Sequence, residues 1–168
     1  KALSLEVSKF IVNIESSALS KDSTASLATL MRVDQYLLSS TLSVERLAVR
    51  LKEREMLKLS SLEVNTKEFF EGVLDLMNSS RVESNEISDL LSVQFGELQS
   101  EHDQLKANLI TAGTHSQISV AQMSETIDCL SEALRLAQLW FKAFIRIHNL
   151  QTELVQITDT ENQKVENI

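Results

Sequence analysis

Three histidines are the residues of this sequence best suited to acid–base or metal chemistry: His102, His115 and His148. None of them follows a glutamate by three residues, and no His-Glu-x-x-His occurs, so the ligand spacings of helical metal sites are absent. Glu101 and Asp103 flank His102 directly, and consecutive side chains on a helix point about 100° apart. We therefore predict a solvated polar patch around His102, and no metal site.

Nucleophilic chemistry has equally little support in the sequence. The single thiol, Cys129, lies beside Leu130 at an apolar helical position, and no intrachain disulfide can form. We interpret it as a buried, unreactive side chain in a reducing compartment. No serine or cysteine can be matched with a positioned base, and no glycine-rich phosphate loop is present. The sequence therefore predicts a protein that is not an enzyme and needs no cofactor.

Four basic side chains recur at every fourth residue of one segment, which would place them in a stripe along a helix. They are Arg46, Arg50, Arg54 and Lys58. Such a stripe could contact phospholipid head groups or an acidic partner. Glutamates at positions 45, 53 and 55 flank it, however, and the acidic stretch 83–101 offers a counterpart within the chain. We favour pairing within the protein, or simple solvation, over lipid binding.

Large apolar side chains gather near residue 140 in greater number than one narrow helical seam can hold. Phe141 and Phe144 fall on heptad positions, whereas Trp140 and Ile147 face sideways and need a second contact surface. Phe69 and Phe70 are adjacent and therefore lie on different faces of a helix, so they also need two contact surfaces. The core of a multi-helix bundle and a partner interface both meet it, so the candidate interface residues are Trp140, Phe141, Phe144, Ile147, Phe69 and Phe70.

Charge limits the classes of partner. The formal net charge is −8, and nucleic acids and anionic membranes both attract an excess of Lys and Arg instead. We therefore expect no nucleic-acid partner, and the charge also disfavours membrane contact. A transmembrane helix needs about 20 consecutive apolar residues, whereas the most apolar stretch, 134–147, contains Arg135, Lys142 and Arg146. We expect a soluble protein in the cytoplasm or the nucleus.

The elements that carry these residues must be helices, because the chain has no proline and three glycines. Apolar spacing and cap signals predict helices over about 2–18, 24–78, 81–111 and 115–165. The serines and threonine at 39–41 could interrupt the second helix, but one continuous helix is favoured. Expected core positions are Leu30, Leu37, Val44 and Leu51 in the second helix and Ile87, Leu91, Leu98, Leu105 and Leu109 in the third.

Two pairs have the spacing of a capping box at a helix N-terminus: Ser80 with Glu83, and Thr114 with Gln117. Gly113 suits the left-handed residue that commonly ends a helix. These signals predict the boundaries of the third and fourth helices.

Helix length then decides the architecture. The second and fourth helices would each be roughly 75–80 Å long, whereas a globule of this size is about 40 Å across. We predict an all-α fold, an elongated antiparallel bundle or coiled coil of about four helices in one domain, 1–168. The third helix alone cannot cover both long ones, so either the first and third helices stack end to end along the rod or a second chain covers what they leave exposed. We favour a homodimer or a helical protein partner. Because the sequence begins with Lys1, we expect a piece of a larger protein.

The segment from Val44 to Leu76, with VERLAVRLKERE leading to NTKEFFEGVLDL, resembles the first long helices of sorting-nexin BAR domains. That resemblance implies a membrane-curvature module with a basic concave face, although the net acidity departs from it. The preferred hypothesis is a non-enzymatic protein–protein interaction and self-association module, a coiled-coil scaffold or adaptor of a trafficking or cytoskeletal complex. The alternative is a BAR-like module that binds anionic lipid through the basic stripe.

Overall fold

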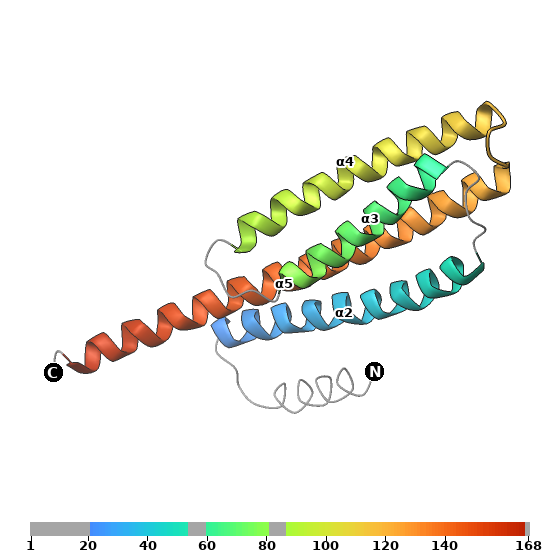
Figure 1. Ribbon diagram of the computed structural model, residues 1–168. Helices are drawn as coiled ribbons and strands as arrows, with labels where there is room; N and C mark the ends of the chain where they lie inside the picture. The colour runs from blue at the N-terminus through green and yellow to red at the C-terminus, as the bar shows by residue number, and fades with distance from the viewer. Residues whose placement is uncertain (1–20, 54–59, 81–86, 167–168) are drawn as a thin grey trace. The chain divides into compact units, whose positions relative to one another are not determined.

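The computed structural model of the protein describes residues 21–53, 60–80 and 87–166, with side chains described over 23–53, 61–80 and 87–152 (Figure 1). Over these residues the chain forms helices and no strand, which confirms the predicted all-α fold. In chain order they are α2 (Lys21–Glu53), α3 (Ser60–Ser79), α4 (Ile87–Thr114) and α5 (Val120–Glu166). The two longest, α2 and α5, have 33 and 47 residues. The predicted helix over 2–18 lies outside the described residues.

The single helix expected over 24–78 is two helices in the structure. α2 ends at Glu53 and α3 begins at Ser60, and the residues between them lie outside the described ranges. α2 runs without interruption through 39–41, so the serine-rich stretch does not break it. Apolar spacing could not reveal the separation, because both helices are amphipathic and their patterns follow one another closely in the sequence.

The turn between α4 and α5 differs in detail from the predicted one. Ser116, rather than Gly113, has the left-handed backbone conformation, with φ 57°. Gly113 lies in the last turn of α4, and a Cβ built there would approach Met123 Sδ to 2.5 Å. A larger residue at this position would therefore have to displace the Met123 side chain at the start of α5.

The N-terminus of α5 is closed by a capping box at Ser119 and Gln122. The Gln122 N–H donates to Ser119 Oγ at 3.1 Å, and the Ser119 N–H donates to Gln122 Oε1 at 3.2 Å. Thr114, the predicted cap, instead donates its hydroxyl to the Thr111 carbonyl at 2.8 Å. Two of the orphan N–H groups at this helix end are thereby satisfied, five residues later than the sequence predicted.

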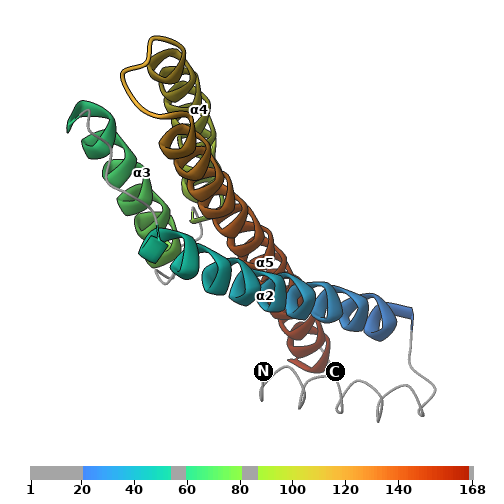
Figure 2. The same cartoon turned by 90° about the vertical axis from the view of Figure 1, so that its right-hand side faces the viewer.

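The contacts of the chain fall into two compact units: residues 39–141, and residues 1–38 with 142–168. In the larger unit α3 lies alongside α4 and runs antiparallel to it (Figures 1 and 2). Its core confirms the apolar face predicted for α4. The largest fully buried apolar side chains are Phe69, Leu76, Leu91, Leu109 and Leu130.

In the smaller unit, the described core is modest. Val33 of α2 and Ala143 of α5 are buried. The guanidinium of Arg146 lies over the Tyr36 ring, 5.8 Å from its centroid, in the geometry of a cation–π contact. No helix in the described part of the chain has the length and apolar character needed to cross a membrane.

Candidate functional site

Trp140 and Phe141, two of the predicted interface residues, make defined contacts within the larger unit. The indole N–H of Trp140 donates to Ser80 Oγ at 3.0 Å. The Phe141 ring stacks on Phe95 with centroids 5.1 Å apart and an interplanar angle of 8°. Both side chains are half-buried. Their size is thus used in part for holding α5 against α3 and α4, as the bundle-core interpretation expects.

Phe69 is fully buried in the same unit, and Phe70 is half-buried. Their rings meet edge to face, with centroids 6.0 Å apart. In the smaller unit Phe144 stacks on His148 at 6.1 Å, and Ile147 is half-buried. None of the six predicted interface residues is exposed, and a role of any of them in binding a partner stays a prediction.

His102 is not the solvated residue that the sequence suggested. It is 8% exposed, its ring lies 6.2 Å from that of Phe69, and its Nε2 is 3.4 Å from Ser131 Oγ. The Nδ1 atom lies 3.0 Å from the exposed carboxylate of Asp103. Position 102 falls between Leu98 and Leu105 on the buried face of α4, so the helical spacing contained the signal that the neighbouring charges obscured.

The basic stripe is partly engaged within the larger unit. Arg50 Nη1 donates to Asp128 Oδ2 at 2.8 Å, and Arg46 Nη1 lies 3.8 Å from Glu132 Oε1. The acidic counterpart is α5, and not the acidic stretch 83–101 that we expected. The other two members of the stripe, Arg54 and Lys58, lie outside the described residues.

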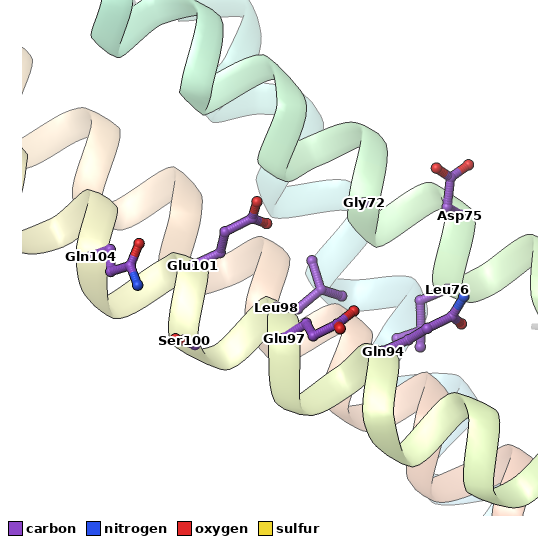
Figure 3. Close-up of a pocket in the computed structure, with 9 residues that line it drawn as sticks. All are labelled: Gly72, Asp75, Leu76, Gln94, Glu97, Leu98, Ser100, Glu101 and Gln104. Carbon is purple, nitrogen blue, oxygen red and sulfur yellow. The ribbon is translucent and has the colours of Figure 1, made fainter.

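An acidic groove lies between α3 and α4 in the larger unit (Figure 3). Its volume is about 440 Å³, and its lining includes Asp75, Glu97 and Glu101. The three carboxylates do not converge, because Asp75 points away from the other two (Figure 3). Among the described residues, no group of three or more His, Cys, Asp or Glu side chains could hold a metal ion. The groove is therefore an acidic surface feature without ligand geometry.

The most unusual surface of the described chain is the outward face of α2. Four large apolar side chains lie on it, with exposed fractions of 40% for Met31, 39% for Leu38, 40% for Leu42 and 55% for Val49. Three polar residues complete the face. Together these seven exposed positions are called the α2 seam: Met31, Gln35, Leu38, Leu42, Glu45, Val49 and Lys52.

The α2 seam lies on the side of the helix opposite to its buried side. The buried residues of α2 are Val33, Ser40 and Ser43, and at 100° per residue they fall between about 120° and 200° around the helix from the seam. Beside Leu42 and Val49 the surface is hollowed into a groove of about 520 Å³, lined also by Glu45, Arg46, Arg50 and Glu53. α2 therefore has one face that packs and a second apolar face that does not.

Sequence reasoning missed this face although the pattern contains it. Spacings of four and three residues alternate through the α2 seam, which is the spacing of a coiled-coil contact. We instead assigned the core to Leu30, Val44 and Leu51, which are 42%, 46% and 39% exposed. Because α2 has apolar residues on more than one side, periodicity alone cannot say which side is buried.

Comparison of the chain with protein-family models, with curated proteins and with solved structures found no match.

Proposed function

We propose that the protein is a non-enzymatic interaction module, a helical scaffold or adaptor segment that self-associates through the α2 seam. The observation that supports this most directly is the exposure of four large apolar side chains on one face of one helix. Single exposed apolar residues are ordinary on protein surfaces, but several aligned on one face of a helix are typical of an interaction site. The seam also carries polar residues between the apolar ones, as partner-selective helical contacts do.

A helical partner suits this face better than a flat or extended one. Knobs-into-holes packing needs side chains at alternating spacings of four and three residues, and these are the spacings of the α2 seam. Arg46, Glu53 and Arg32 lie at its edges and are exposed. A narrow apolar stripe with charged edges is the usual layout of a helix that binds one other helix.

The alternative function, binding of anionic membranes through the basic stripe, is less well supported. The two described members of the stripe have carboxylate partners within the chain, and the net charge is −8. Lipid binding would have to compete with those ion pairs, and anionic head groups would repel the rest of the acidic protein surface. We therefore place the module among protein-binding rather than lipid-binding proteins.

Sedimentation velocity over a wide concentration range tests the proposal. The expected mass rises from the 18.9 kDa of a single chain toward twice that value. The Leu38→Glu/Leu42→Glu double variant should remain monomeric with unchanged helicity by circular dichroism, because both side chains are on the exposed face. The matched control is Leu74→Glu/Val93→Glu, which places the same charges on exposed residues of α3 and α4. A wild-type chain that stays monomeric throughout would overturn the proposal.

A further inference from the structure

We infer that two copies of the chain pair through α2 in an antiparallel arrangement with one defined register. In that register Met31 lies opposite Val49 of the second copy, Gln35 opposite Glu45, and Leu38 opposite Leu42. The inference rests on the proposed self-association and adds its geometry. It is drawn from the order of residue types along the α2 seam and from their exposure.

The α2 seam is long enough for a specific helix pair. From Met31 to Lys52 it extends roughly 32 Å at 1.5 Å per residue, and all seven of its residues are exposed. The neighbouring exposed residues Leu30, Val44 and Leu51 would form a poorer contact with a second helix. The adjacent row of side chains, which a helix–helix contact also needs, would contain Asp34 and Thr41. The α2 seam therefore provides the better helix-binding face.

From Met31 to Val49 the order of residue types in the seam is the same when it is followed in either direction, whereas Lys52 lies outside this repeat and opposite Ala28 of the second copy. From Met31 to Leu38 the types are apolar, polar, apolar, and from Leu42 to Val49 they are again apolar, polar, apolar. A face with this symmetry is complementary to itself about a twofold axis, which is the requirement of an isologous dimer. The axis would cross the seam between Leu38 and Leu42.

Other arrangements of the same two helices are less favourable. A parallel pair would place Glu45 of each copy against the other, and like charges at a core position repel. An antiparallel pair shifted by one heptad would place Glu45 against Leu42 in one direction, or Gln35 against Leu38 in the other. Either shift places a polar side chain against an apolar one in the middle of the contact, whereas the proposed register pairs Glu45 with the amide of Gln35 and leaves such a mismatch at the end of the seam, where Lys52 lies opposite Ala28.

Like charges at the edge of the α2 seam oppose the pairing, and they also provide a test of the register. In the proposed register Arg32 lies at the same edge as Arg46 of the second copy, and the symmetry produces this contact twice. Arg46 has Glu132 of its own chain 3.8 Å away, which offsets part of the repulsion. With a seam of only seven positions, the interface falls below the standard size of about 1,600 Å². We therefore expect a weak dimer whose affinity improves when the like charges are screened.

Site-specific cross-linking with a short bismaleimide tests the register in the full chain. Thr41→Cys should cross-link to itself, because residue 41 lies close to the twofold axis. Lys52→Cys should not, since the two copies of residue 52 would be roughly 36 Å apart, but mixing it with Ala28→Cys should yield the heterodimer. The native Cys129 is buried, so the wild-type chain serves as the blank.

The outcomes separate this inference from the proposed function. Cross-linking of Lys52→Cys to itself would show a parallel pair and overturn the register. A dimer in sedimentation without any of the expected cross-links would overturn the use of the α2 seam in this geometry while leaving self-association intact. A monomer in sedimentation would overturn both proposals.

A charge reversal provides a second test that a merely destabilised protein could not pass. Arg32→Glu would turn both like-charge contacts into ion pairs with Arg46, so dimerisation should strengthen by about twofold to thirtyfold. The matched control is Arg135→Glu, an exposed residue of α5, which changes the net charge equally and should bring no such gain. Equal effects of the two substitutions would contradict the register.

Discussion

The α3–α4 pair and α2 differ in how far their apolar side chains are buried. α3 and α4 share a buried apolar face, on which Phe69 and Leu109 are fully buried and Leu91 is 1% exposed, and five further large apolar residues of these two helices are exposed: Val64, Leu74, Leu90, Val93 and Ile110. In the described part of α2, Val33 is the one buried apolar residue. Seven of the thirteen exposed large apolar residues in the described chain lie on α2: Leu30, Met31, Leu38, Leu42, Val44, Val49 and Leu51.

The buried apolar residues of α3 and α4 stabilise the fold, whereas the exposed apolar residues of α2 are available for contact with another helix. Burial of apolar area is the main favourable term in folding, and in the described helices it is concentrated in α3, α4 and the first half of α5. Apolar side chains that stay in water contribute little to folding and remain free to bury area against another helix. We therefore propose α2 as the helix through which the protein associates at small cost to its own stability.

The largest expected effect comes from truncating the buried core. Phe69→Ala should reduce the free energy of unfolding by about 3–5 kcal/mol, since it leaves a cavity at a site with no exposure. Leu42→Ala on the α2 seam should change it by less than about 0.5 kcal/mol. Urea denaturation at a concentration where the chain is monomeric measures both. Similar losses from the two variants would break the comparison.

Substitutions at two glycines of α4 should sharpen the comparison between packed and exposed positions. Gly113→Val should cost about 1 kcal/mol, because an added Cβ would have to displace the flexible thioether of Met123. Gly96→Ala should instead stabilise by about 0.5–1 kcal/mol, since nothing lies within 4 Å of an added Cβ and alanine is the better helix former. Thermal unfolding should move the two midpoints in opposite directions, and two losses would show that Gly96 is also packed.

The hydrogen bond that joins α5 to the end of α3 should have a smaller effect. Trp140→Phe keeps the ring but removes the indole N–H, and the loss of one neutral hydrogen bond costs about 1 kcal/mol. A double-mutant cycle with Ser80→Ala in urea denaturation isolates that bond. If the two single effects simply add, the contact between Trp140 and Ser80 contributes nothing to stability.

The exposed ion pair of α2 should matter least. Arg50 and Asp128 are 46% and 52% exposed, so Arg50→Ala should cost about 0.2–1 kcal/mol of stability. The loss should shrink as salt is added, because surface charges are screened. Measuring unfolding at low and high salt checks both points, and a loss above this range that is insensitive to salt would show that the basic stripe is part of the core.

The fold class and the α4 core could be predicted because they depend on local signals. Leu98, Leu105 and Leu109 repeat at helical spacing, and the chain lacks proline to end a helix early. The separation of α2 from α3 could not be predicted, because both helices are amphipathic and no glycine or proline lies between them. The capping box at Ser119 has a competitor of similar pattern only five residues earlier.

The candidate site was harder to predict than the fold. Trp140 and Phe141 were singled out by size, but size does not distinguish a core contact from a partner contact. The α2 seam was overlooked because Leu30, Val44 and Leu51 satisfied the same periodicity on another side of the helix. Which apolar side of a helix becomes buried depends on the other helices that pack against it, and that information is not local.

Hydrogen–deuterium exchange of the full chain at low and high protein concentration tests the central claim most directly. The account predicts that amide exchange over residues 28–52 slows as concentration rises, while exchange in α3 and α4 stays unchanged. Leu38→Glu/Leu42→Glu should abolish that dependence. Protection that increases over α3 and α4 instead, or exchange that is independent of concentration everywhere, would contradict the claim that α2 is the self-association surface.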